Sequence, residues 1–179
     1  MDCRGVFQEA GAPNDRCSRM SESKPGCSCE SESVSIHSPG PVDDSEPVAR
    51  LIYSPLHIDV ATGEITEAAF SDVQDKGLSV QRMAHATNAQ IRTIGESKLT
   101  RDHARGKSDR EFRGIAIGRV DLIRGLKYDN SERAFCVYDS AIPDVSTHAD
   151  VCQTTASRSE MKRARKKLRD LFSNKPFTP

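Results

Sequence analysis

The stretch Phe112-Arg-Gly-Ile-Ala-Ile-Gly-Arg-Val120 decides the fold, because it opens residues 112–151, where apolar residues are dense enough for the middle of a core. Ile115 and Ile117 alternate with small residues, and this period of two is typical of a strand. Glycine inside a strand indicates that another segment or a ligand approaches closely. We therefore predict a central or ligand-facing strand here.

The pattern continues after this strand. Asp121 can cap a short helical turn that ends near Gly125, and Ala134-Phe-Cys-Val-Tyr138 is a second β-favouring run. A segment rich in turn-forming residues then leads to His148-Ala-Asp-Val151. A strand, short helix, strand and loop in this order can place polar groups at the edge of a sheet.

Further β-favouring pieces precede the stretch, at residues 48–53, 54–65 and 77–82. A helix is expected from a cap at Thr87 or Asn88 to Gly95. Residues 98–111 are almost wholly charged or polar, so we expect an exposed loop there. A loop of this length suggests function or mobility.

The clearest local signal lies near the C-terminus. Ser157-Arg-Ser-Glu160 is a capping box, in which each side chain satisfies a backbone amide of the other residue. Apolar residues then fall on one helical face up to Phe172, and Asn174 and Pro176 end the helix. Cations fill the remaining positions: Lys162, Arg163, Arg165, Lys166, Lys167 and Arg169.

Residues 1–46 are rich in Ser, Glu, Pro, Gly and Asp and show no hydrophobic period. Such a segment buries too little apolar surface to offset its chain entropy, so we predict a disordered tail. Met20 opens the Ser/Glu-rich part of this segment. We hypothesise that Met20 is the true start of the protein.

The predicted fold is one α+β domain over residues 47–173, with a mostly antiparallel sheet of five or six short strands and two helices, followed by a tail at 174–179. Only 36% of the residues are apolar, which fits a partly unfolded chain. The 26 basic and 26 acidic residues cancel, so net charge favours no class of partner. Neither a membrane span nor a signal peptide is evident, and we expect a cytoplasmic protein.

Four of the six cysteines lie in the first 30 residues. The pair Cys27 and Cys29 lacks a second pair or a histidine at zinc-site spacing, so incidental thiols are favoured over a metal site. Cys136 and Cys152 fall in expected strands and are interpreted as small buried residues. Disulfides are not expected in a reducing compartment. We expect no metal and no cofactor.

The cationic helix allows several interpretations. It can follow a phosphate backbone, lie on an anionic membrane or occupy a groove in a partner protein. It can equally be an ordinary terminal helix that packs its apolar face and keeps its cations in water. No aromatic residue is interleaved for base stacking, which disfavours sequence-specific recognition of single strands.

A second candidate site is dispersed along the chain. It consists of Arg50, His57, Ser79, Arg82 and His148, all in or beside β-favouring pieces. Arginine can clamp a phosphate in bidentate fashion and histidine can transfer a proton, so a convergent set would suit a nucleotide. The alternative is a set of surface arginines with His148 paired locally to Asp150. The sequence lacks the local motifs of phosphate-binding loops, dinucleotide-binding folds, the nucleophile elbow of hydrolases and zinc peptidases.

The pieces around Arg50, Phe70, Leu78 to Arg82 and His148 to Val151 resemble short bacterial proteins with an early Arg strand, an "LSV-x-R" step and a late "HA-[DE]-[VI]". The resemblance covers roughly residues 48–152. It implies that Arg50, Ser79, Arg82 and His148 form a shared site, without implying an activity.

Two functions follow as expectations. The first is an accessory or regulatory protein, without catalytic activity, that binds a partner protein or nucleic acid through the helix at 157–172. The alternative is a small enzyme or sensor that acts on a nucleotide or RNA through Arg50, Arg82 and His148. The two differ in whether these three side chains lie in one pocket.

Overall fold

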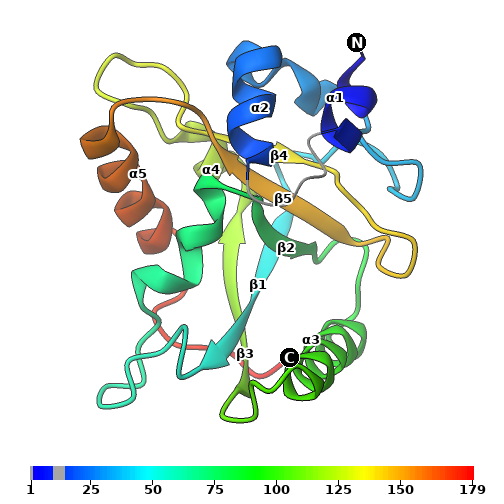
Figure 1. Ribbon diagram of the computed structural model, residues 1–179, viewed down its shortest axis with the longest axis vertical. Helices are drawn as coiled ribbons and strands as arrows, with labels where there is room; N and C mark the ends of the chain where they lie inside the picture. The colour runs from blue at the N-terminus through cyan, green and yellow to red at the C-terminus, as the bar shows by residue number, and fades with distance from the viewer. Residues whose placement is uncertain (1, 10–14) are drawn as a thin grey trace.

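The computed structural model describes residues 2–9 and 15–179. It shows an α+β protein built on a five-stranded antiparallel sheet with the order β3-β1-β2-β5-β4 (Figure 1). The strands are β1 (Pro47–Ser54), β2 (Leu78–Arg82), β3 (Glu111–Arg119), β4 (Phe135–Tyr138) and β5 (His148–Gln153). The helices are α1 (Cys3–Glu9), α2 (Arg16–Ser23), η1 (Pro25–Ser31), η2 (Glu67–Gln74), α3 (Asn88–Ala104), α4 (Val120–Gly125) and α5 (Arg158–Asp170).

The predicted α+β class and antiparallel sheet are confirmed, whereas the expectation of two helices is wrong. The described residues form seven helical segments, of which η1 and η2 are 3-10 helices. The expected loop at 98–111 is also wrong in its first half, because α3 continues to Ala104. Gly95 lies inside α3 and does not end it. The absence of a side chain there leaves room for the Phe112 ring.

The strand that opens the densest apolar region is β3, and it lies at the edge of the sheet rather than at its centre. The close approach that its glycines indicate is confirmed. The carbonyl of Phe177 lies against Gly114, and the ring of Phe172 lies against Gly118. Backbone hydrogen bonds of 2.8 and 2.9 Å join Phe177 to Ile115, so the C-terminal residues cover the edge of β3.

The structure also differs from the disorder expected for residues 1–46. Within the described parts of this segment, three helices pack beside β4 and β5, and Met20 is fully buried. Disulfides hold them: Cys3–Cys29, Cys17–Cys152 and Cys27–Cys136. The Glu30 carboxylate adds ion pairs to Arg133 at 2.6 Å and to Arg124 at 3.3 Å. Cross-links and partly buried ion pairs thus stabilise a segment whose apolar content alone is too low.

These three disulfides correct the interpretation of the cysteines as incidental or simply buried thiols. All six cysteines are paired. Two of the bridges connect the N-terminal helices to β4 and β5, over sequence separations of 109 and 135 residues. Disulfides of this kind persist in oxidising environments and are rare in the cytosol, so the expected cytoplasmic location is not confirmed.

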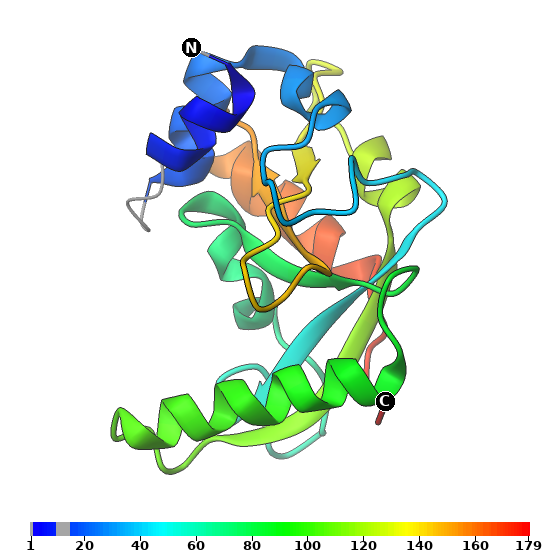
Figure 2. The ribbon, with the colours of Figure 1, turned by 90° about the vertical axis from the view of Figure 1, so that its right-hand side faces the viewer.

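The two faces of the sheet carry different layers. On one face, α5, η2 and α4 cover the main core, where the rings of Phe70 and Phe172 lie 5.0 Å apart. On the other face, α3 covers a smaller cluster formed with Leu51 and Tyr53 of β1. Figure 2 shows α3 running across one end of the molecule, opposite the N-terminal helices. No helix in the described part of the chain has the length and apolar character needed to cross a bilayer.

The partial pairing of β1 with β2 positions the candidate site. Only two residue pairs join these strands, Val48 with Arg82 and Ala49 with Gln81, whereas β1 pairs with β3 along its whole length. Beyond Ala49 the two strands diverge (Figure 1). The residues of β2 before Gln81 do not pair with β1, so their backbone carbonyls on that side need other hydrogen-bond donors.

Candidate functional site: a cationic cleft beside β1

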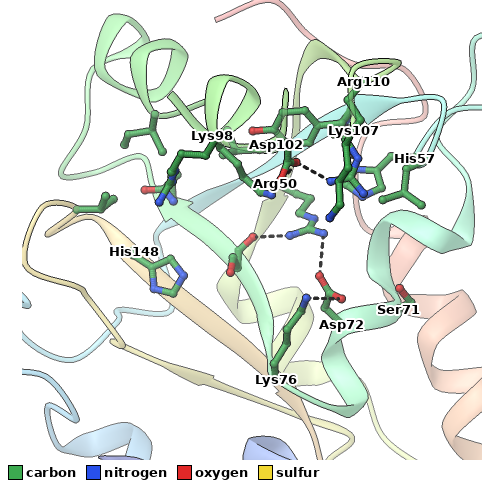
Figure 3. Close-up of a pocket in the computed structure, with 18 of the residues that line it drawn as sticks. Arg50, His57, Ser71, Asp72, Lys76, Lys98, Asp102, Lys107, Arg110 and His148 are labelled. Carbon is green, nitrogen blue, oxygen red and sulfur yellow. Dashed lines mark hydrogen bonds and ion pairs between the residues drawn. The ribbon is translucent and has the colours of Figure 1, made fainter. Parts of the chain in front are cut away.

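A cleft of about 520 Å³ lies where β1 and β2 separate (Figure 3). Its walls come from β1, β2, η2 and α3, together with the loops that follow α3 and precede β5. We call it the cationic cleft. Its charged lining residues are Arg50, Asp72, Lys76, Lys98, Arg101, Asp102, Arg105, Lys107 and Arg110, and its histidines are His57 and His148.

Arg50 forms the floor of the cleft and replaces part of the missing strand pairing. Its guanidinium donates to the Ser79 carbonyl at 3.1 Å, to the Ala69 carbonyl at 3.0 Å and to the Asp72 carboxylate at 3.4 Å. Burial lowers the pKa of Arg50, and the Asp72 charge opposes this effect. These bonds use three of the five N–H groups of the guanidinium. Two N–H groups therefore have no partner among the described residues.

His57 lies at one end of the cleft, beside Lys107 and Arg110 (Figure 3). Its Nδ1 atom accepts a hydrogen bond of 3.2 Å from the backbone N–H of Tyr53. Burial, reinforced by the Arg50 charge, lowers the pKa of His57 to about 3. The imidazole is therefore neutral at neutral pH, and because Nδ1 accepts, the proton resides on Nε2. His57 supplies an uncharged N–H donor to the site.

Helix α3, its C-cap residue and the loop that follows carry five of the seven cations of the cleft. Lys98 and Arg101 of α3 and Arg105 at its C-cap are spaced by three and four residues, so they lie along one side of the helix. The buried Asp102 carboxylate accepts from Arg110 at 2.5 Å and from Lys98 at 3.4 Å, and so ties the loop after α3 to the helix. Burial lowers the pKa of Lys98, while Asp102 opposes that effect.

The lining is strongly unbalanced in charge. Seven lysines and arginines face two aspartates, an excess of five positive charges. Both carboxylates already form ion pairs with lining cations. Arg101, Arg105 and Lys107 form no ion pair with any described residue. A concave surface with this excess concentrates anions.

His148 lies at the opposite end of the cleft from His57 (Figure 3). Its Nδ1 atom is 3.0 Å from the Ser140 carbonyl, which can only accept, and its Nε2 atom is 3.7 Å from the Asp150 carboxylate. Asp150 is itself buried and accepts from Ser140 Oγ at 2.8 Å and from Arg16 at 3.2 Å. The local partners expected for His148 are thus present, and the ring also lines the cleft.

Arg82 lies elsewhere. It is only 2% exposed, and all five of its N–H groups donate hydrogen bonds. Two go to the Glu46 carboxylate, and the other three go to the Ser38 hydroxyl and to the Gly40 and Pro41 carbonyls. Its side chain holds the segment that precedes β1 against the sheet. The structure therefore brings together Arg50, His57, Ser79 and His148 of the dispersed set, and separates Arg82 from them.

The cationic helix α5 is also separate from the cleft. Its capping box is present as predicted, and Ala164 and Leu168 pack into the main core. Arg163 pairs with Asp129 at 2.7 Å, and Arg169 donates to the Ile65 carbonyl at 2.8 Å. Lys162, Lys166 and Lys167 are exposed, whereas Arg165 is half-buried.

Sequence reasoning missed the cations of α3 and of the loop that follows it. These are Lys98, Arg101, Arg105, Lys107 and Arg110. Their spacing over 98–105 is a helical signal, but Gly95 and the low apolar content favoured a loop.

Comparison with family models, curated proteins and solved structures finds no match to this chain.

Proposed function

We propose that this protein binds a small phosphorylated ligand, a nucleotide or the end of an RNA, in the cationic cleft. One observation carries the proposal: seven cations and two carboxylates line a single cleft, and three of those cations have no ion-pair partner among the described residues. The proposal corresponds to a sensor or small enzyme rather than to binding through α5. Arg82 lies outside the cleft, so the expected set of Arg50, Arg82 and His148 does not support it, and it rests instead on the cations that line the cleft with Arg50.

The excess of five positive charges in the lining favours a polyanion such as a phosphate chain over a single carboxylate. Arginine and lysine are the residues that hold phosphate oxygens, arginine through two parallel N–H groups. The buried Arg50 adds two N–H groups without a partner among the described residues, and the neutral His57 adds its Nε2–H group. The volume of about 520 Å³ lies within the roughly 300–1,000 Å³ typical of small-molecule sites.

The proposal is tested by measuring binding of a nucleoside triphosphate to the Arg101→Ala, Arg105→Ala double variant. Both side chains are exposed, Arg101 on α3 and Arg105 at its C-cap, so the fold will be retained. Affinity is expected to fall about tenfold or more, because a hydrogen bond between charged groups contributes about 1.5–3 kcal/mol. The matched control is Lys166→Ala, Lys167→Ala on α5, which removes the same charge outside the cleft and should leave affinity within about twofold.

Equal weakening in both double variants would mean that the whole protein attracts anions without a defined site. Absence of binding to any phosphorylated probe in the wild-type protein would refute the proposal. Binding that survives the α3 change but not the α5 change would move the site to the helix.

A second candidate function rests on α5. Lys162, Lys166 and Lys167 are exposed on its outer face and have no ion-pair partner among the described residues. They would suit an anionic partner, either a nucleic acid or an acidic protein surface. Replacing Lys162, Arg163, Lys166 and Lys167 by Glu should abolish such binding without loss of the fold. Unchanged capture of RNA or of the partner would eliminate this candidate.

A further inference from the structure

The two ends of the cationic cleft differ in chemistry. His57, Lys107 and Arg110 lie at one end, and His148 lies at the other, with Arg50 between them (Figure 3). The loop that leads into His148 contributes two apolar lining residues, Ile142 and Val145. Of the labelled cations, Lys107 and Arg110 lie beside His57, and none lies beside His148 (Figure 3).

Two apolar side chains at the His148 end line the cleft without being buried in the core. Ile142 is 46% exposed and Val145 is half-buried. Mutual backbone hydrogen bonds of 2.9 and 3.3 Å fix Ile142 and Val145 in one turn. Ile94, one turn before Lys98 on α3, also lines the cleft and packs in part against the cluster under α3. Ile142 and Val145 offer a surface for a flat, uncharged ring.

Gln81 supplies a polar group beside this surface. Its side chain is only 3% exposed, yet it lines the cleft. It is the cross-strand partner of His148, so the two side chains stand next to each other on one face of the sheet. The Thr147 hydroxyl donates to Gln81 Oε1 at 2.7 Å, which fixes the amide orientation. The Nε2 amide group of Gln81 has no partner among the described residues.

From this arrangement we infer that the ligand is a nucleoside phosphate whose base lies at the His148 end, against Ile142 and beside Gln81, and whose phosphates lie at the His57 end. The inference rests on the proposed function and deepens it. An amide with a free donor next to exposed aliphatic side chains matches the needs of a base, which is apolar on its face and polar on its edge. Lys107 and Arg110 at the opposite end match a phosphate chain.

The test compares affinities by calorimetry for four nucleoside triphosphates and for inorganic tripolyphosphate, at equal ionic strength without metal. At least one nucleotide should bind about tenfold or more tightly than tripolyphosphate. Ile142→Ser should remove most of this advantage and leave tripolyphosphate affinity within about twofold, because Ile142 is exposed and lies away from the cationic end. Leu122→Ser is the matched control, since Leu122 is also 46% exposed but does not line the cleft.

Two further variants separate the ends of the cleft. Gln81→Met keeps the length of the side chain but removes both the Nε2 donor and the Oε1 acceptor of the Thr147 hydroxyl, so it should reduce the preference among bases. Lys107→Ala should weaken nucleotides and tripolyphosphate alike. If tripolyphosphate binds as tightly as every nucleotide, or if Ile142→Ser and Leu122→Ser behave alike, the inference is overturned while the proposed function stands. If no probe binds, both fail.

Discussion

Acidification will destabilise this protein through a single buried histidine. His57 accepts a hydrogen bond from Tyr53 N–H on Nδ1, and burial lowers its folded-state pKa to about 3, whereas a histidine in the unfolded chain has a pKa of about 6.5. Above pH 6.5 both states are neutral and His57 contributes nothing to pH dependence. As the pH falls from 6.5 toward 3, only the unfolded state gains a proton, so the free energy of unfolding decreases.

The expected size of the effect follows from the gap between the two pKa values. At pH 5 the solution is about 1.5 units below the unfolded-state pKa, and each unit corresponds to about 1.36 kcal/mol. The free energy of unfolding should therefore fall by about 2 kcal/mol between pH 7.5 and pH 5 through His57 alone. Carboxylates whose pKa is lowered in the folded state, such as Glu46, lose their contribution only at lower pH.

Urea unfolding at pH 7.5 and pH 5 measures this difference. The His57→Asn variant keeps an acceptor for Tyr53 N–H but has no group that titrates, so its stability should change about 2 kcal/mol less than that of the wild type. The exposed His37 provides the control, because His37→Asn should retain the full acid sensitivity. An equal loss of stability in the wild type and in His57→Asn would refute the reasoning.

Two further predictions concern the framework around the cleft. Replacing Arg82 by Met should lower the free energy of unfolding by about 3–5 kcal/mol, because it leaves the buried Glu46 carboxylate without its partner. Adding Glu46→Gln to that variant should recover part of the loss. If the losses of the two single variants simply add in chemical denaturation, the coupling of Arg82 and Glu46 is contradicted. Peptide mapping under non-reducing conditions should recover the pairs Cys3–Cys29, Cys17–Cys152 and Cys27–Cys136, and Cys17→Ala with Cys152→Ala should lower the free energy of unfolding by about 2–5 kcal/mol. Six free thiols in protein prepared under oxidising conditions would contradict this pairing.

Local sequence patterns predicted the elements that depend on interactions between residues close in sequence. The alternation around Ile115 and Ile117 indicated a strand, and the Ser157 to Glu160 capping box located the start of α5 within one residue. The glycines of β3 correctly indicated a close approach, but only the structure shows that the C-terminal residues make it. Position within the sheet depends on pairing between distant strands, so the placement of β3 at an edge could not be read from its own residues.

The candidate site was only partly predictable for the same reason. Arg50 and Arg82 look alike in sequence, since both lie in strands that lead into the site region. The buried Glu46 captures Arg82, whereas the divergence of β1 from β2 leaves Arg50 on the floor of the cleft. The disulfides were not predicted, because they join cysteines more than 100 residues apart in the sequence. They stabilise a segment whose low apolar content by itself indicates disorder.

The central claim is that the cationic cleft binds a phosphorylated ligand, and the most direct test is to follow the histidine side chains by NMR during titration with a nucleoside triphosphate. His57 and His148 lie at the two ends of the cleft, whereas His37 and His85 lie outside it. The imidazole signals of His57 and His148 should shift together and saturate with one dissociation constant, while those of His37 and His85 stay in place. Saturable shifts confined to His37 and His85, or no shift at any histidine, would contradict the account.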